Sequence, residues 1–193
     1  MYLNKMTKNN LRIEYQNKRN LLTEFENNNL NELIIDRFTS HFEFNNKKIH
    51  LFLPIIKKRE INTFKLFESL FANNCTIVSS KSNFINHTLS HFIITKDTKY
   101  NYNSLGIPEP DNSIETSIKD IDIILIPLLV FDSKGNRIGY GKGFYDRFLS
   151  QVSENCIKIG LSHFEAYEKE LPIDKYDIKL DFCVTPNQVY SFK

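Results

Sequence analysis

The chain has 193 residues, of which 41% are hydrophobic and 25% are charged, and its formal net charge is +2. A chain of this length can bury roughly 70% of the surface that its unfolded form exposes, so it needs no disulfide bonds to fold. The composition is typical of a soluble globular protein, and the small net charge argues against a general nucleic-acid or membrane surface while leaving room for local cationic pockets.

The N-terminal region is predicted to form two helices. Apolar residues recur at three-, four- and seven-residue spacing over residues 5–26, which is typical of a helix with one buried face. A second helix is predicted over residues 30–42. The run Asn27–Asn29 between them has the composition of a loop, although the chain uses asparagine heavily throughout.

Helices and strands are predicted to alternate after residue 48. Short strands are expected over His50–Leu53, Cys75–Ser79 and His91–Thr95. A helix is predicted over residues 64–72, with Thr63 placed to cap its N-terminus. Residues 96–117 are expected to be mostly loop.

The strongest strand prediction covers residues 121–126, because this apolar run indicates burial on both faces, as in a parallel sheet. A helix over residues 144–149 and strands over 157–161 and 182–185 follow it. The alternation of helices and strands predicts an α/β fold. No internal repeat or linker is evident, so residues 1–193 are expected to form a single domain.

The cysteines and the N-terminus indicate the cellular compartment of the protein. The three cysteines are far apart and each borders a β-branched apolar segment, which is typical of buried free thiols in a reducing compartment: Cys75, Cys156 and Cys183. The N-terminus has no apolar signal region, and no apolar run approaches the about 20 residues that cross a membrane. We therefore expect a cytoplasmic protein.

The segment Arg137–Asp146 (Arg-Ile-Gly-Tyr-Gly-Lys-Gly-Phe-Tyr-Asp) is the most informative stretch of the chain. Its three glycines lie between a predicted strand and a predicted helix, an arrangement that presents backbone N–H groups and a positive helix end to phosphate. Arg137 and Lys142 add cationic donors. The segment therefore predicts a site for a phosphate group or a nucleotide.

The glycine spacing fits neither of two common nucleotide-binding motifs. The dinucleotide fingerprint is G-x-G-x-x-G, whereas the spacing here is Gly139-x-Gly141-x-Gly143. The Walker A motif fails as well, because Gly143 follows Lys142 where a serine or threonine should bind magnesium. A tight structural turn is the alternative explanation of the loop.

Asp146 has two possible roles on sequence grounds. Near the start of a helix a carboxylate stabilises the helix dipole by roughly 0.3–1 kcal/mol. Beside a phosphate loop the same carboxylate suits magnesium, which prefers hard oxygen ligands. Both roles stay open from the residues alone.

Around this loop the chain resembles the 5-formyltetrahydrofolate cyclo-ligase family, also called methenyltetrahydrofolate synthetases. The pattern that carries the resemblance consists of Pro127, Phe131–Asp132, Gly135 and Arg137–Asp146. Weaker matches occur in the same order at Lys8–Arg12, Glu60–Thr63, Gly106–Pro110, Asp177–Asp181 and Val184–Thr185. The resemblance spans about residues 8–185, and it implies a three-layer α/β sandwich with a mostly parallel central sheet and N-terminal helices.

The reaction that the resemblance implies converts 5-formyltetrahydrofolate and ATP, with Mg²⁺, into 5,10-methenyltetrahydrofolate, ADP and phosphate. The γ-phosphoryl group moves to the formyl oxygen, N10 of the folate attacks the activated carbon, and phosphate leaves. This route requires no nucleophile from the protein. It therefore agrees with the absence of any recognisable Ser-His or Cys-His pattern in the sequence.

The resemblance also implies roles for individual residues. ATP would be bound by Lys8, Arg12, Arg137, Gly139, Tyr140, Gly141, Lys142, Gly143, Phe144 and Tyr145. Folate would contact Glu60, Tyr140, Gly141, Lys142, Gly143 and Phe144. Asp146 and Asp177 would hold Mg²⁺. Lys142, Arg137 and Tyr145 are the expected catalytic residues, and Glu60 is the candidate base for ring closure.

The chain departs from the family pattern at a few positions, none of which removes a phosphate or metal residue: Asn62, Ser79–Ser80, Leu105 and Tyr176. The departures at Asn62, Ser79–Ser80 and Leu105 motivate one alternative, a binding protein for folate or nucleotide that has lost turnover. An ATP-independent enzyme of a related α/β type is another, and it would need a catalytic carboxylate of its own. We expect a monomer with small-molecule substrates and no nucleic-acid or membrane partner.

Overall fold

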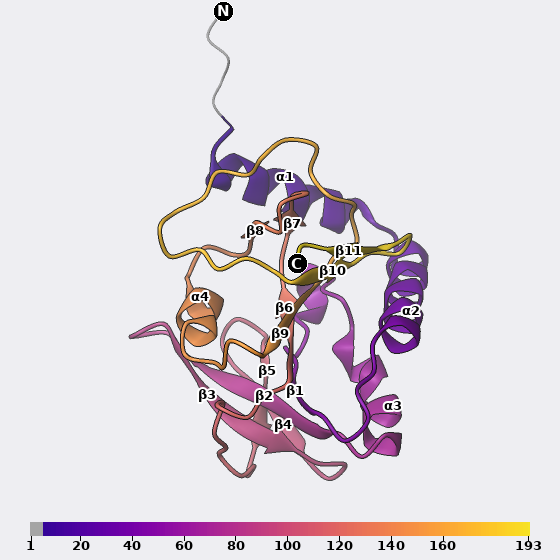
Figure 1. Ribbon diagram of the computed structural model, residues 1–193, viewed down its shortest axis with the longest axis vertical. Helices are drawn as coiled ribbons and strands as arrows, with labels where there is room; N and C mark the ends of the chain where they lie inside the picture. Colours follow the sequence, from indigo (N-terminus) through magenta and orange to yellow (C-terminus); the bar gives the residue numbers. More distant parts are fainter. Residues whose placement is uncertain (1–5) are drawn as a thin grey trace, which may run out of the picture.

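The centre of the fold is strand β6 (Ile123–Pro127) in the computed structural model, which describes residues 6–193 (Figure 1). Its first four residues are buried and divide between two hydrophobic clusters, Ile123 and Leu125 in one and Ile124 and Ile126 in the other. Because successive side chains of a strand point to opposite faces, β6 supplies apolar surface to both sides of the sheet. The predicted strand with two buried faces is confirmed.

Strand β6 belongs to a seven-stranded sheet with the order β11-β10-β9-β6-β1-β2-β3. The other strands are β1 (Lys48–His50), β2 (Thr76–Asn83), β3 (Thr88–Ile94), β9 (Ile157–Leu161), β10 (Phe182–Val184) and β11 (Val189–Ser191). The pairings from β10 to β2 are parallel, and β11 and β3 pair antiparallel at the two edges. The sheet is mostly parallel, as predicted, although β11 was not expected.

Helices cover both faces of this sheet. Figure 1 shows α2 (Glu24–His41) and α3 (Phe67–Ala72) on one side and α4 (Phe144–Leu149) on the other. On the first side, Phe38 of α2 packs in the same cluster as Ile123; on the second, Phe148 of α4 packs with Ile124. The result is the predicted three-layer α/β arrangement.

The two N-terminal helices divide at a different place from the predicted one. Helix α1 covers Lys8–Leu21 and α2 begins at Glu24, so the single helix over 5–26 is wrong and Asn27–Asn29 is helical. Residue 5 itself lies outside the described residues. The Thr23 side chain accepts a hydrogen bond from the Glu26 N–H, and the Glu26 carboxylate accepts one from the Thr23 N–H. This capping box starts α2 before the asparagines.

The prediction of loop over residues 96–117 is also wrong in part. Strands β4 (Lys99–Tyr102) and β5 (Pro108–Asp111) form an antiparallel hairpin there. The second strand was not predicted because it contains two prolines, and proline is rare inside sheets. They are tolerated here because β5 belongs to a two-stranded ribbon and not to the middle of a sheet.

Two local predictions before the hairpin need correction. Strand β1 ends at His50, and the buried residues Leu51–Leu53 continue beyond it as irregular backbone. Thr63 does not cap a helix; it begins a short 3-10 helix, η2 (Thr63–Leu66), and its hydroxyl donates to the Phe52 carbonyl. The neighbouring Asn62 caps η2 instead, because its side chain accepts from the Phe64 N–H.

Helix α1 packs beside the loop that carries the glycines. It contacts a small antiparallel ribbon formed by β7 (Val130–Phe131) and β8 (Arg137–Ile138), and the 3-10 helix η1 (Ile56–Lys58). Leu11 and Tyr15 of α1 pack with the ribbon in one apolar cluster, whose other buried members are Leu129, Val130, Ile138 and Leu171. This contact places the N-terminal helix beyond the carboxyl ends of β1 and β6, where open α/β sheets bind their ligands.

The three cysteines are buried and unpaired, as predicted. Burial raises the pKa of Cys156 to about 11 and that of Cys183 well above its ordinary value, so both thiols stay protonated at neutral pH. Of the helices within residues 6–193, none is both long and apolar enough to cross a membrane.

Two buried histidines lie under α4. The ring centroids of His50 on β1 and His91 on β3 are 5.2 Å apart, and both rings pack on Phe148. Within the described chain, neither nitrogen of His50 nor Nδ1 of His91 has a hydrogen-bond partner. Burial lowers the pKa of His91 to about 4 and that of His50 well below its ordinary value.

We expect acid to destabilise the fold through these histidines. In the unfolded chain both take up a proton near pH 6.5, whereas in the folded chain they stay neutral down to a much lower pH, so acid favours unfolding. Each should lower the free energy of unfolding by about 2 kcal/mol between pH 6.5 and 5. Urea unfolding at pH 7 and pH 5 measures the loss. His91→Leu should make it smaller, and an equal loss in that variant contradicts the assignment.

Candidate functional site

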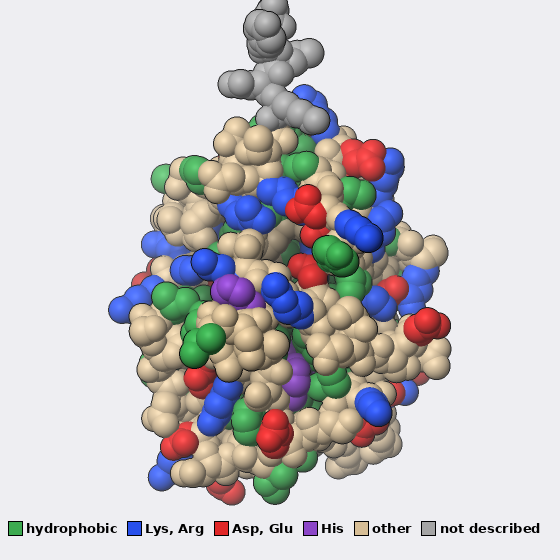
Figure 2. Space-filling view, turned by 90° about the vertical axis from the view of Figure 1, so that its left-hand side faces the viewer, with side chains coloured by type: hydrophobic (Ala, Val, Ile, Leu, Met, Phe, Trp, Pro, Cys, Tyr) green, Lys and Arg blue, Asp and Glu red, His purple; other side chains and the backbone are tan. Residues whose placement is uncertain are grey.

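A cleft opens between α1, the glycine loop and the β2–β3 hairpin. Figure 2 shows Lys and Arg side chains gathered around a hollow on one side of the molecule, with carboxylates among them. The cleft is lined by every residue predicted for the site: Lys8, Arg12, Glu60, Arg137, Gly139, Tyr140, Gly141, Lys142, Gly143, Phe144, Tyr145, Asp146 and Asp177. The fold therefore brings together residues from four separate parts of the chain.

The glycine loop has a backbone that only glycine adopts easily. Gly141 and Gly143 have φ angles of 88° and 70°. A Cβ at Gly141 would lie 2.8 Å from Cζ of Arg12, whose Nε donates to the Gly139 carbonyl at 3.0 Å. The loop is thus wrapped closely around the Arg12 guanidinium group.

Arg137 and Asp146 form an ion pair at the base of this loop. Nη1 and Nη2 of Arg137 donate to Oδ1 of Asp146 at 3.0 and 2.8 Å, and the side chains are 5% and 25% exposed. The Ile178 N–H donates to the same oxygen at 3.2 Å. Asp146 therefore has a role that neither sequence interpretation contained, namely to balance a buried guanidinium group.

Lys8 is likewise engaged with carboxylates. Its Nζ donates to Asp174 at 2.7 Å and to Asp177, and Oδ2 of Asp177 also accepts the Asp174 N–H at 2.8 Å. This pairing docks the start of α1 on the segment that precedes β10. A phosphate bound here would compete with Asp177 for the Lys8 ammonium group.

The two carboxylates that were predicted to bind magnesium both lie at the cleft. Among residues 6–193 no group of three or more His, Cys, Asp or Glu side chains is placed to hold a metal. Asp146 and Asp177 line the same cleft, and Oδ2 of Asp146 and Oδ1 of Asp177 accept no hydrogen bond from a described residue. Because Mg²⁺ is commonly held by one or two carboxylates together with phosphate oxygens and water, this pair fits an ion that arrives with a nucleotide.

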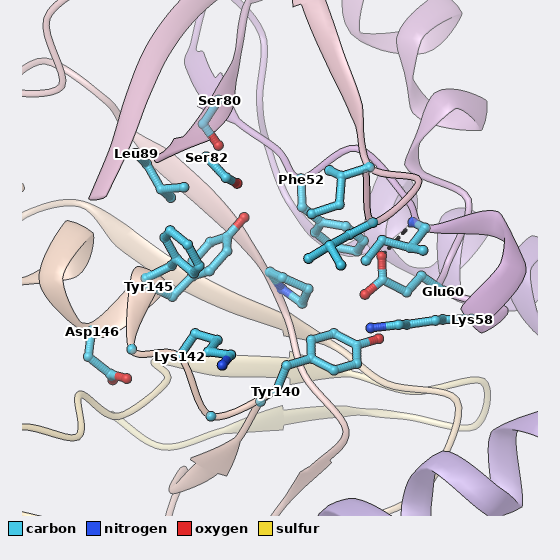
Figure 3. Close-up of a pocket in the computed structure, with 18 of the residues that line it drawn as sticks. Phe52, Lys58, Glu60, Ser80, Ser82, Leu89, Tyr140, Lys142, Tyr145 and Asp146 are labelled. Carbon is cyan, nitrogen blue, oxygen red and sulfur yellow. Dashed lines mark hydrogen bonds between the residues drawn. The ribbon is translucent and has the colours of Figure 1, made fainter. Parts of the chain in front are cut away.

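Glu60 lies at the other end of the cleft. Its carboxylate is buried and Oε2 accepts a hydrogen bond from the Ile55 N–H at 2.6 Å (Figure 3). Burial raises the pKa of Glu60, while the Ile55 hydrogen bond, Tyr140 and the cations Arg19 and Lys58 oppose that rise. The result is a carboxyl group held in a fixed position with a pKa above its ordinary value, as a general base requires.

Tyr145 can donate a hydrogen bond but is unsuited to act as a base. Its ring lies against His50 and Phe148, with centroid distances of 6.3 and 6.1 Å. Burial, and then the charge of Glu60, raise its pKa above its ordinary value. Its hydroxyl therefore keeps its proton throughout the neutral range.

Several cleft residues were missed by the sequence analysis. Lys58 is one, and its Nζ lies 4.4 Å from the ring centroid of Tyr140 (Figure 3). Its position two residues before Glu60 was the available signal. The others form mainly apolar walls: Phe52, Leu53, Ile55, Ser82, Phe84 and Leu89. The last three were missed because the β2–β3 hairpin extends beyond the strands that were predicted.

The departures from the family pattern divide into two groups. Ser80 and Leu105 line the cleft, so they can affect what it binds. Asn62 caps η2, and Tyr176 is exposed outside the cleft lining. Only the first two bear on substrate contacts.

The chain resembles known proteins along most of its length. Residues 4–186 match the 5-formyltetrahydrofolate cyclo-ligase family. The chain is 30% identical over 183 residues to 5-formyltetrahydrofolate cyclo-ligase of Mycoplasma pneumoniae, covering 93% of this chain and 98% of the relative. Identity to the Haemophilus influenzae cyclo-ligase is 34% over 125 residues, 63% of this chain and 67% of the relative. The NMR structure of Aquifex aeolicus 5,10-methenyltetrahydrofolate synthetase superposes with a TM-score of 0.83 at 32% identity, covering 97% and 94% of the two chains.

Proposed function

Because this chain belongs to the 5-formyltetrahydrofolate cyclo-ligase family, we propose that it closes the ring of 5-formyltetrahydrofolate with ATP and Mg²⁺, giving 5,10-methenyltetrahydrofolate, ADP and phosphate. The observation that carries the proposal is the two-ended cleft. One end has the glycine loop with cations and two carboxylates, and the other has apolar walls around Glu60. A nucleotide and a folate could therefore meet in one cleft.

The chemistry requires the formyl oxygen to become a leaving group. The formyl oxygen attacks the γ-phosphorus, the bond to the β-phosphate oxygen breaks, and ADP leaves. N10 then attacks the formyl carbon, loses its proton, and phosphate departs with the former formyl oxygen. Phosphoryl transfer of this kind depends mainly on positioning and charge neutralisation, and needs no nucleophile from the protein.

The residues at the loop end would bind and orient the triphosphate. The backbone N–H groups of the loop, with Lys142 exposed at the cleft and Arg12 beneath it, would contact the phosphate oxygens. Asp146 and Asp177 would hold Mg²⁺, which when bound neutralises charge on the phosphate oxygens. Arg137 would keep the Asp146 carboxylate in place, through the hydrogen bonds that it already donates.

The residues at the other end would bind the folate. The apolar walls suit the pterin and the aminobenzoyl ring. The free oxygen of Glu60 can accept a hydrogen bond from a ring N–H, or take the proton that N10 loses. Tyr145, with its raised pKa, would act as a hydrogen-bond donor.

Formation of the methenyl product tests the proposal directly. Purified protein with 5-formyltetrahydrofolate should show growth of the product's near-ultraviolet absorbance only when both ATP and Mg²⁺ are present, with one ADP released per product. Omitting either ATP or the metal is the control. A flat trace from folded protein that still binds 5-formyltetrahydrofolate would instead support a binding protein without turnover, as the Ser80 and Leu105 departures suggest.

A further inference from the structure

Helix α1 holds the glycine loop at two points. Arg12 contacts the Gly139 carbonyl, and Arg19, two helical turns further on the same face, donates from Nη1 to the Tyr140 hydroxyl at 3.0 Å. Nη2 of Arg19 donates to the Leu128 carbonyl at 2.6 Å. Arg12 lines the cleft, whereas Arg19 is only 3% exposed and lies behind it.

Arg19 is a buried cation without a carboxylate partner. Within residues 6–193 it forms no salt bridge, and its Nε has no hydrogen-bond partner. The nearby His163 ring is uncharged at neutral pH, because burial and then Arg19 lower its pKa to about 3, and a neutral ring does not balance the Arg19 charge. Burying a guanidinium group in this way lowers the free energy of unfolding. A role in the site therefore explains the position of Arg19 better than a contribution to stability does.

Tyr140 connects Arg19 to Glu60. Figure 3 shows the Tyr140 hydroxyl and the Glu60 carboxylate directed to the same end of the cleft, near the ammonium group of Lys58. A hydroxyl that accepts from Arg19 still has its own proton to donate. Glu60 uses Oε2 for the Ile55 N–H, which leaves its second oxygen as an acceptor on this side.

We propose that Arg19 is a positioning residue for the ring closure: it fixes Tyr140 and, through Tyr140, keeps the Glu60 carboxylate ionised and aligned for the folate. This inference rests on the proposed function, and it extends the site to a residue that touches neither substrate. Under this proposal, helix α1 supports both ends of the cleft. Arg12 supports the phosphate end, and Arg19 supports the folate end.

The proposal makes an electrostatic prediction. The charged and titratable groups that face Glu60 are Arg19, Lys58, Tyr140 and Tyr145, and the two cations oppose the rise in its pKa that burial causes. Loss of the Arg19 charge should therefore raise the pKa of Glu60 further. The acid limb of the pH profile of kcat/KM for 5-formyltetrahydrofolate should then move to higher pH.

The test compares Arg19→Met, Arg19→Lys and the matched control Arg37→Met. Arg37 on α2 is also partly buried, and its Nε and Nη2 donate to the Pro186 carbonyl at 3.2 and 2.9 Å, outside the cleft. Arg19→Met should lower kcat/KM for the folate roughly 10- to 100-fold, the range for one hydrogen bond from a charged group, and move the acid limb upward. Its KM for ATP should stay near the wild-type value. Arg19→Lys should restore the position of the acid limb.

The outcomes separate positioning from a purely structural role. If Arg19→Met and Arg37→Met both lower the melting temperature but leave kcat/KM per folded molecule and the pH profile unchanged, Arg19 is structural and the proposal is overturned. Calorimetric binding of 5-formyltetrahydrofolate across pH gives a second readout. Wild-type protein that binds the folate without turnover would refute the proposed function, and the pH dependence of Kd in Arg19→Met would still decide the role of Arg19.

Discussion

Replacing Gly141 with alanine is expected to lower kcat by about 100-fold, the effect of displacing a positioned group by about 1 Å, while the protein stays folded. The reason lies in the space around the loop. A Cβ at Gly141 would lie 2.8 Å from Cζ of Arg12 and 3.0 Å from its Nε and Nη2. The added methyl group must push the guanidinium group away from the Gly139 carbonyl, which it now contacts at 3.0 Å.

Backbone strain alone does not account for the expected loss. Alanine at the positive φ of Gly141 costs about 1 kcal/mol of stability, which a folded domain tolerates. The steric effect falls instead on Arg12, which lines the phosphate end of the cleft. We therefore expect KM for ATP to rise together with the fall in kcat, and KM for the folate to change less.

Two further variants isolate the steric effect. Gly106 also has a positive φ, 74°, but a Cβ there would meet nothing within 4 Å, so Gly106→Ala carries the strain without the clash and should keep most of its turnover. Arg12→Ala removes the group that the new methyl would strike. In the Arg12→Ala background, Gly141→Ala should lower kcat far less than it does in the wild type. If the losses in kcat from the two substitutions are fully additive, the steric mechanism is wrong.

The loop could be predicted from sequence because its signal is local. The alternating glycines, the cations between them and the buried strand before them all lie within about 25 consecutive residues, and they constrain one another. The resemblance then located Glu60 and Asp177, which are far away in the chain but line the same cleft. The resemblance therefore predicted which residues line the cleft.

The partners of the charged groups could not be predicted in the same way. From the sequence, Arg137 and Lys8 were expected to bind phosphate and Asp146 and Asp177 to bind magnesium, whereas the structure pairs each cation with one of these acids. Such pairing depends on side-chain directions across a turn or between distant segments, and residue spacing does not report it. Arg19 was missed for the same reason, since on sequence it is one more basic residue on a helix.

The Arg137–Asp146 pair leads to the second large effect, that of Asp146→Asn. This change leaves a guanidinium group that is 5% exposed without its charged partner, so the free energy of unfolding should fall by about 3 kcal/mol. If Asp146 also binds magnesium, the half-saturating Mg²⁺ concentration for turnover should rise at least about tenfold. Denaturant unfolding and a metal titration of the rate measure the two effects separately.

Asp177→Asn is the matched comparison, since it makes the same exchange at the other predicted metal ligand. Its partner Lys8 is more exposed than Arg137, at 19%, so this variant should lose no more than about 1 kcal/mol of stability. A shared metal site requires that both variants raise the magnesium requirement, although only Asp146→Asn destabilises the fold strongly. If Asp146→Asn is destabilised but titrates with Mg²⁺ like the wild type, its carboxylate serves Arg137 alone, and the magnesium assignment at Asp146 is wrong.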